Sequence, residues 1–362
     1  MQQMLLDSPT VAATVPAVAA EVRPARLWTP KRVVFTPAAL DEPWGQQTYH
    51  RVQQLGLPIE ELPTNRVTGV RGADERATYS AAKRTLAVVT APAGQFKLQP
   101  IPPSADWQFH LAEGCPAHCQ YCYLAGSLSG PPMVRVFANL PQILDNLARY
   151  DRPGQMTTFE ASCYTDPLGI EHLTGSLAET IRYFGTRKDG HLRYVSKFDA
   201  VDHLLDLPHN GQTRARFSVN AAPVSQRLEG GTASVAARLQ AARKMAQAGY
   251  PIGLVVAPIM PIPDWEEHYT RFFDLAQQTL DVSCDLTFEL ITHRFTPGSK
   301  DVLLQWYPNT SLDLDETKRT TKRNKYGSIK YVYSREMMKT LQRFFNREIA
   351  ERFPQAQVLY WT

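Results

Sequence analysis

The sequence contains few cysteines: five among 362 residues, three of them crowded between positions 115 and 122. A secreted protein stabilised by disulfides carries an even, paired set of cysteines, so this distribution argues against that class. A protein of the reducing cytoplasm is the better interpretation. No stretch approaches the roughly 18 apolar residues that a membrane-spanning helix requires, so we expect no membrane partner.

The chain also lacks a strong net charge, because 39 Lys and Arg residues against 35 Asp and Glu give a formal charge of +4. A polyanionic partner must therefore be met by a local basic patch. The segment 318–330, KRTTKRNKYGSIK, is such a patch, with six basic residues and no acidic one. A turn at Gly327 and Ser328 would fold it into a basic hairpin, and a helix over 334–353 follows.

The first hundred residues lack a glycine-rich phosphate loop, so nothing there supports nucleotide binding in the Rossmann manner. Residues 1–25 lack the basic start of a signal peptide and are broken by prolines, which predicts a disordered leader. Strand and helix patterns alternate over residues 26–103 and predict a small N-terminal α/β domain. The predicted strands are 31–37, 59–62 and 84–92, with a helix over 43–56 and another before the last strand.

From residue 104 to 299, short β-rich runs alternate with stretches of helical spacing, which is typical of βα units and a parallel sheet. Six units are too few for a complete eight-stranded barrel, so we predict an α/β fold with a partial (β/α)6 barrel. Residues 300–362 form a C-terminal basic hairpin and helix packing on the barrel. The predicted strands are 107–113, 156–162, 192–198, 214–221, 252–259 and 286–292, and the helices 140–150, 172–187, 200–207, 234–250 and 265–280.

Polar and sulfur-bearing residues follow nearly every predicted barrel strand. In parallel βα folds the reactive groups gather at the C-terminal ends of the strands, so these residues are candidates for a common site. In chain order they are Cys115, then Cys163 and Asp166, then Lys197, then Ser218 and Asn220, and finally His293 and Arg294.

Cys115, Cys119 and Cys122 have the spacing C-x3-C-x2-C on the loop after the first barrel strand. Iron–sulfur clusters take cysteine thiolates, normally four, so three thiolates would leave one iron open to a small chelating molecule. The alternative is a zinc site completed by His118, His110 or a distant cysteine. Zinc motifs usually come as two C-x2-C pairs, so the spacing favours the cluster.

The motif GCPAHCQYCYL resembles the signature of the radical SAM enzymes, whose fold is a partial (β/α)6 barrel with this loop after its first strand. Together with TFEASCYTDPLGIEHLTGSL, VSKFDAVDHLLDLPHNGQTRARFSVN, DLTFELITHRFT and LDLDETKR, it is similar to the spore photoproduct lyase family from about Lys31 to the C-terminus. The resemblance implies a carbon–carbon lyase for DNA repair, which reverts a methylene-linked thymine dimer to two thymines. It also implies a 4Fe-4S cluster on the three cysteines, with S-adenosyl-L-methionine (AdoMet) on the open iron and a 5'-deoxyadenosyl radical.

The resemblance further assigns roles to single residues. Cys163 matches the family's hydrogen donor, while Tyr121 and Tyr123 match its relay tyrosines, and Tyr121 also fills a position against the adenine. Taken without the resemblance, these residues are a buried cysteine and two packing aromatics. The positions matched to AdoMet binding are Lys197, Ser218 and Asn220.

The same resemblance places the lesion at the exit of the sixth strand. Basic residues there would neutralise phosphates of the DNA. The thymine pair would be extruded from the base stack. The alternative for the basic segment is an ordinary solvated face. The expected partners are DNA containing a thymine dimer photoproduct and an electron donor such as flavodoxin or ferredoxin. The candidate DNA contacts are His293, Arg294, Lys318, Arg319, Lys322, Arg323, Lys325, Tyr326 and Lys330.

The chain departs from the family pattern in two places. Trp306 stands where arginine is usual before a Tyr-Pro pair, and Tyr164 and Thr165 are bulkier than the usual neighbours of the donor cysteine. Two other functions stay open, the first because of these departures and the second because of the alternative zinc site. One is a related radical SAM enzyme acting on another nucleic-acid lesion or base, and the other is a zinc-stapled nucleic-acid-binding protein.

Overall fold

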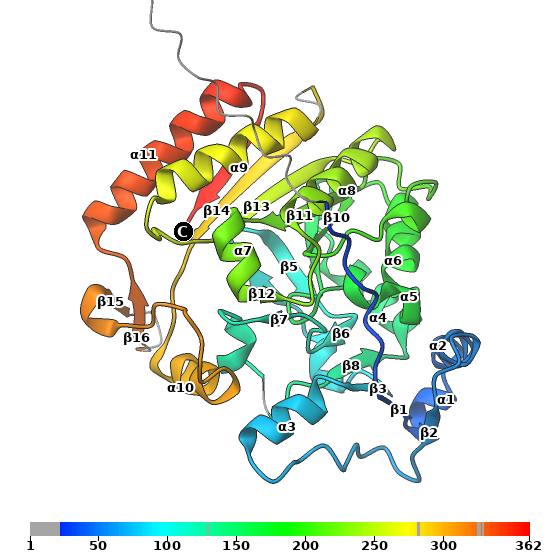
Figure 1. Ribbon diagram of the computed structural model, residues 1–362. Helices are drawn as coiled ribbons and strands as arrows, with labels where there is room; N and C mark the ends of the chain where they lie inside the picture. Colours follow the sequence, from blue (N-terminus) through cyan, green and yellow to red (C-terminus); the bar gives the residue numbers. More distant parts are fainter. Residues whose placement is uncertain (1–21, 129, 281–282, 324–326, 328) are drawn as a thin grey trace, which may run out of the picture.

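The computed structural model describes residues 22–128, 130–280, 283–323, 327 and 329–362. Two sheets, one of eight strands and one of five, organise this part of the chain (Figure 1). Most of the predicted leader, as well as Lys325 and Tyr326, lies outside the described residues. No described helix is long and apolar enough to cross a bilayer.

The larger sheet is the predicted partial barrel. Its order is β17-β14-β13-β11-β10-β9-β5-β4, and every pair except β4 with β5 is parallel. Six of these strands correspond to the six predicted runs, and β17 adds a seventh parallel strand from the end of the chain. The bounds are β4 Gln99–Ile101, β5 Ala105–Phe109, β9 Thr157–Ala161, β10 Gly190–Ser196, β11 Thr213–Val219, β13 Ile252–Ile259, β14 Leu286–Thr292 and β17 Gln357–Trp361.

Helices cover the outer face of the curled sheet (Figure 1). In α8, Ser234 caps the first turn by accepting a hydrogen bond from the Ala237 N–H, and Leu239 and Ala242 are fully buried. Such one-sided burial is what the helical spacing of the sequence predicts. The helices are α4 Leu140–Leu147, α5 Glu171–Thr174, α6 Ser176–Gly185, α7 Ala222–Leu228, α8 Val235–Gln247, α9 Trp265–Thr279 and α11 Arg335–Arg352.

One predicted helix is wrong. Residues 200–207 contain only a 3-10 turn over Asp202–Leu204. Val201 and Leu204, both fully buried, are three residues apart, the spacing that a 3-10 turn places on one side. The segment is also too short to gain much from α-helical propagation.

The smaller sheet has the order β2-β1-β3-β8-β6. Its first three strands are the predicted ones of the N-terminal region, but β8 and β6 follow residue 103 and flank the segment 114–133, which we call the cysteine loop. The sheet therefore holds both ends of that loop. The bounds are β1 Arg32–Phe35, β2 Ile59–Glu61, β3 Thr85–Val89, β6 Ala112–Glu113 and β8 Val134–Phe137, with α1 Pro37–Leu40, α2 Pro43–Gln54 and α3 Glu75–Ala82.

Gly114 marks the point where the two ends of the cysteine loop meet. It has φ +78°, a left-handed conformation that favours glycine. A Cβ at this position would lie 2.0 Å from the Met133 carbonyl oxygen. The close approach therefore requires glycine.

The division of the chain at residue 103 stays a prediction.

The C-terminal region contains the predicted hairpin and helix. β15 (Thr320–Arg323) pairs antiparallel with β16 (Ile329–Val332), and Gly327 between them has φ +83°. A bridge between Phe295 and Tyr331 ties the hairpin to the barrel. It is preceded by α10 (Pro297–Trp306), which a capping box begins.

A network of buried charges crosses the interior of the barrel. Arg216 lies 2.6 Å from Glu160 and 2.8 Å from Glu289, and Arg193 contacts Glu289 as well. Burial alone would raise the pKa of Glu160, but Arg216, Ser104 and Arg193 together outweigh burial and the pKa is lowered. Such a network is tolerated only because each charge has a partner.

Replacing Glu289 with alanine should destabilise the protein strongly, because two buried arginines would lose their shared carboxylate. We expect a loss of about 3–5 kcal/mol in the free energy of unfolding, measured by urea denaturation. The control is Glu267→Ala, which removes an exposed helical pair with Arg271 and should cost no more than about 0.5 kcal/mol. Equal unfolding midpoints for the two variants would contradict the assignment.

Candidate functional site

The cysteine loop lies at the C-terminal end of the barrel strands and is fixed on two sides. Its β7 (His118–Cys119) pairs antiparallel with β12 (Glu229–Gly230), which follows α7. A 3-10 turn, η2 (Tyr123–Gly126), approaches α10, since a Cβ on Gly126 would lie 3.1 Å from the Ser299 Cβ. The loop is thus held by the barrel and by the C-terminal region.

The three thiols of the loop act on one another electrostatically. Burial raises the pKa of Cys115 to about 11, with Lys83 as the largest opposing influence. Burial also raises the pKa of Cys119 and Cys122. Thiolates at these positions therefore need a compensating positive charge, which bound iron provides.

A single metal ion does not fit this loop. Among residues 22–128, 130–280, 283–323, 327 and 329–362, no three His, Cys, Asp or Glu side chains gather closely enough to hold one. A zinc ion needs each sulfur ligand about 2.3 Å from one point. Neither histidine belongs to such a group within the described residues; His118 Nδ1 lies 3.1 Å from the Tyr79 hydroxyl, and His110 stacks on Tyr164.

A cluster is a better fit than a single ion, because each thiolate then binds a different iron. The loop matches that requirement. Its three thiols are spread along the chain and have raised pKa values, and its sequence holds no fourth cysteine. The geometry thus argues against the zinc-stapled alternative.

Three of the residues matched to the cofactor gather beside the loop. The Lys197 ammonium donates to the Ser218 hydroxyl at 2.7 Å and lies 5.7 Å from the centre of the Tyr121 ring. The Tyr121 hydroxyl donates to Glu229, which pairs with the buried Arg238 at 2.6 Å. Strand ends β10 and β11 thus present an ammonium above an aromatic face.

Asn220 is placed differently from these three. It is fully buried, its amide donates to the Pro258 carbonyl at 2.7 Å, and its carbonyl accepts from the Tyr269 hydroxyl at 2.8 Å. The bond to Pro258 joins the ends of β11 and β13, and the bond from Tyr269 ties them to α9. A contact with a cofactor stays a prediction for this residue.

Asp166, another strand-exit candidate, is also engaged within the protein. Its carboxylate accepts from the Ser196 hydroxyl at 2.8 Å and from the Lys197 backbone N–H at 2.7 Å. Asp166 therefore fixes the end of β10, from which Lys197 projects.

A strained elbow presents Cys163 at the end of β9. Ser162 has φ +59°, which costs a residue other than glycine on the order of 1–3 kcal/mol. Its N–H donates to the Phe109 carbonyl at 2.7 Å, and its hydroxyl accepts from the Leu111 N–H at 3.0 Å. These bonds to the first barrel strand turn the chain so that Cys163 follows directly at the barrel mouth.

Cys163 and Tyr123 lie in one neighbourhood although 40 positions separate them in the sequence. The Tyr123 ring is 6.5 Å from that of Tyr164. Desolvation, followed by Cys163 and Cys122, raises the pKa of the Tyr123 hydroxyl. Burial, followed by Glu160, raises the pKa of the Cys163 thiol. Tyr123 is thus the part of the cysteine loop that lies near the predicted hydrogen donor.

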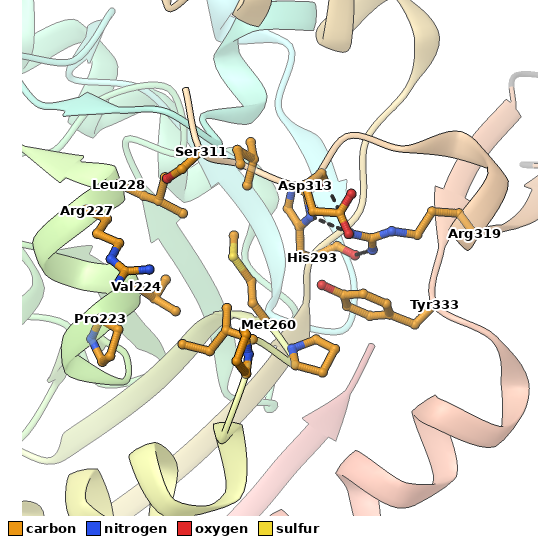
Figure 2. A pocket seen from close by; sticks show the side chains of 14 residues that line it. Pro223, Val224, Arg227, Leu228, Met260, His293, Ser311, Asp313, Arg319 and Tyr333 are labelled. Atoms are coloured by element: carbon orange, nitrogen blue, oxygen red, sulfur yellow. Dashed lines mark hydrogen bonds between the residues drawn. The ribbon is translucent and has the colours of Figure 1, made fainter. Parts of the chain in front are cut away.

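A pocket of about 260 Å³ opens near the end of the sixth barrel strand (Figure 2). The Arg319 guanidinium donates to the backbone carbonyls of His293 and Asp313, each at 3.2 Å, and lies 3.8 Å from the centre of the Tyr333 ring. Burial, helped by Arg319, lowers the pKa of His293 to about 3. His293 is therefore neutral at pH 7, and the basic side chains that line this pocket are Arg227 and Arg319.

The other basic candidates form a charged face on the hairpin. Partial burial and then the charges of Arg294 and Lys322 lower the pKa of Lys330, so these three side chains lie near one another. Arg323 is exposed beside them, and Lys318 pairs with Asp315 at 3.5 Å.

Trp306 does not project from the surface. Its ring stacks on Tyr79 of α3 at 4.7 Å, and the Tyr79 hydroxyl bonds to that of Tyr307. At the position where the family usually has arginine, this chain therefore has a tryptophan that packs α10 against α3.

Sequence reasoning missed several residues around the site. Glu289 carried a usable signal, because it is the one charged residue of the strand LTFELIT, and Arg216 carried a weaker one, because its strand TRARFSV holds a second arginine. Lys83, whose ammonium donates to the carbonyls of Cys115 and Ala117, carried none. A lysine just after a short helix is ordinarily a surface residue.

Comparisons with known proteins agree with this geometry. The family model described as spore photoproduct lyase matches residues 28–362. The chain is similar to the spore photoproduct lyase of Geobacillus sp. (strain Y412MC61), with 47% identity over 341 residues, covering 92% of this chain and 99% of that protein. For the enzyme of Bacillus subtilis (strain 168) the identity is 41% over 340 residues, with coverage of 92% and 99%.

Solved structures give the same result. A spore photoproduct lyase complexed with dinucleoside spore photoproduct matches with a TM-score of 0.88 and 45% identity, over 93% of this chain and 100% of that one. A double mutant with bound AdoMet and dinucleoside spore photoproduct matches with the same values.

Proposed function

This chain belongs to the spore photoproduct lyase family and repairs the spore photoproduct, and from that premise we propose that Cys115, Cys119 and Cys122 hold a 4Fe-4S cluster. We extend to this chain the AdoMet and the dinucleoside photoproduct bound in similar structures. The observation that carries the proposal is the gathering of the cysteine loop, Lys197 and Cys163 at one end of the barrel.

The residues beside the loop are suited to AdoMet. When bound, the cluster and AdoMet supply a 5'-deoxyadenosyl radical. Lys197, oriented by the Ser218 hydroxyl, pairs with the carboxylate of the methionine part. Tyr121, whose hydroxyl Glu229 holds, offers its ring to the adenine. Asn220 keeps the ends of β11 and β13 in register beneath them.

Cys163 supplies a hydrogen atom after the bond between the thymines breaks. Its S–H bond is broken, and a C–H bond forms on the methylene radical of the released thymine. The cysteine is then a thiyl radical and regains a hydrogen atom from the hydroxyl of Tyr123. Tyr121, on the cofactor side of the loop, continues the relay. The proximity of Tyr123 to Cys163 supports this order.

The yield of thymine should not fall as the pH rises from about 7 to about 9. Only the protonated thiol can donate a hydrogen atom, and burial with Glu160 raises the pKa of Cys163 above the ordinary value of about 8.5. The protonated fraction is thus retained where an ordinary thiol would ionise. Chromatography of the products at each pH measures this. Aberrant products that increase with a midpoint below pH 9 would refute it.

The hairpin binds the DNA backbone in this proposal, with Arg294, Lys322, Arg323 and Lys330 facing phosphates. The double variant Lys322→Gln/Arg323→Gln should bind photoproduct-containing duplex more weakly, and the slope of log K against log salt should fall by about 2. Lys244→Gln, on the outer helix α8, is the matched control. An unchanged slope in the double variant, measured by fluorescence anisotropy, would remove the hairpin from the interface.

A one-electron donor such as flavodoxin or ferredoxin reduces the cluster in this proposal, and the enzyme works in the cytoplasm. The absence of disulfides among the five cysteines, all of which the structure describes, supports a reducing compartment.

The decisive test is anaerobic repair of an oligonucleotide that contains one spore photoproduct. Protein reconstituted with iron and sulfide, then supplied with AdoMet and dithionite, should restore thymine. A colourless protein with zinc and no sulfide-bound iron would overturn the cluster, and an intact photoproduct beside cleaved AdoMet would point to a different lesion.

A further inference from the structure

Lys83 is a buried lysine that connects the N-terminal region to the cysteine loop. It follows α3 directly and is only 5% exposed. Its ammonium donates to the backbone carbonyls of Cys115 and Ala117, inside the spacing of the three thiols. The ammonium is therefore held by the backbone of the cysteine loop and has little contact with water.

The charge of Lys83 lacks a counter-ion in the described part of the chain, because no carboxylate there lies within 4.0 Å of its ammonium. Two carbonyls satisfy two of its three N–H groups but do not neutralise the charge. Removing an ammonium from water without an anion is strongly unfavourable. A buried, uncompensated cation in contact with this loop thus points to an anionic ligand.

The surroundings of Lys83 contain little else that could serve as the cation on this side of the loop. His118 Nδ1 lies 3.1 Å from the Tyr79 hydroxyl. Tyr79, 5.9 Å from the ammonium, contributes an aromatic face. Lys197 lies nearer Cys119, and the proposed function engages it with AdoMet and Ser218.

We propose that Lys83 is the counter-charge of the iron–sulfur cluster and makes the cluster easier to reduce. It is a positioning residue, since it acts on the cluster through space and through the loop backbone. The inference rests on the proposed function, because it presupposes the cluster. Reduction adds one electron from the donor and forms no covalent bond, so the negative charge of the cluster rises by one. A fixed cation nearby stabilises the reduced form more than the oxidised form.

The inference also gives the N-terminal region a part in the chemistry. α3 delivers Lys83 to the loop while its Tyr79 packs on Trp306 of α10. Neither residue belongs to the barrel. The barrel thus binds the substrates of the reaction, and the smaller unit sets the charge around the electron-accepting group.

Four purified full-length variants separate the charge of Lys83 from its hydrogen bonds. Lys83→Met removes both, Lys83→Gln keeps an amide donor without the charge, and Lys83→Arg keeps the charge. Lys97→Met removes an exposed lysine of the same region and is the matched control. Each is reconstituted anaerobically, its iron and sulfide are quantified, and its reduction potential is measured by dye-mediated titration with electron paramagnetic resonance, without AdoMet.

We expect Lys83→Gln to lower the equilibrium constant for one-electron reduction at least about tenfold, a shift of about 59 mV to more negative potential. Lys83→Arg and Lys97→Met should stay within about threefold of the unsubstituted chain. Lys83→Met could fail to load iron. In that case, iron loading by Lys83→Arg but not by Lys83→Gln also supports the proposal that the charge of Lys83 stabilises the cluster.

A Lys83→Gln variant with full iron and an unshifted potential overturns the inference and leaves the proposed function intact. An unsubstituted chain that binds no cluster overturns the proposed function instead. The two failures are therefore distinguishable in one set of samples.

Discussion

Replacement of Cys163 by alanine should stop the formation of thymine while AdoMet cleavage continues. Radical formation depends on the cysteine loop and the residues around Lys197, which this substitution does not touch. The methylene radical would lose its hydrogen donor, because the methyl group of alanine has no weak bond to hydrogen. It would then persist and react with whatever reaches it, so aberrant thymine products should replace nearly all of the thymine.

The measurement is parallel quantification of 5'-deoxyadenosine and thymine from a dinucleotide photoproduct by liquid chromatography and mass spectrometry. Cys284→Ala, which lies outside the barrel mouth after α9, is the matched control and should retain both products. Full thymine yield from Cys163→Ala would remove this residue from the mechanism.

The second large effect is expected from Cys119→Ala, which should lose the iron–sulfur cluster and with it all AdoMet cleavage. The backbone of Cys119 belongs to β7 and pairs with β12, so the strand pairing survives the removal of the sulfur. A loss of iron would then reflect the missing ligand and not a collapsed loop. Two thiolates cannot hold a cluster that already lacks a fourth protein ligand.

Iron and sulfide analysis together with the visible absorption of the reconstituted protein checks this prediction. Circular dichroism of the metal-free forms tests whether the fold is unchanged. Cys284→Ala should load iron like the unsubstituted chain. Retention of a full cluster by Cys119→Ala would mean that another group completes the site.

The barrel could be predicted because its strands are buried on both faces. Parallel strands of this kind are continuous β-rich runs, as in Ile252–Ile259, and short patterns suffice to find them. The spacing of Cys115, Cys119 and Cys122 is likewise local. The pairing of β8 with β3 could not be predicted in this way, since a four-residue strand carries no sign of which sheet it joins.

Proximity across the chain explains most of what the sequence left open. Only the family resemblance connected Cys163 with Tyr123, because nothing local shows that an elbow at Ser162 brings them together. Trp306 departs from the family pattern in sequence, and in the structure its ring packs on Tyr79. The role of Lys83 could not be predicted, because its ammonium binds carbonyl groups that lie more than 30 positions away in the sequence.

The clamping of the cysteine loop by β6 and β8 has a consequence for how the enzyme is made. Every strand of the smaller sheet has been translated once synthesis reaches Phe137, before β9 and the strands after it exist. Since domains tend to fold from the N-terminus during synthesis, the frame of the proposed cluster site can close first. The nascent chain would then present its thiols to the iron-delivery machinery while the future barrel mouth is still open.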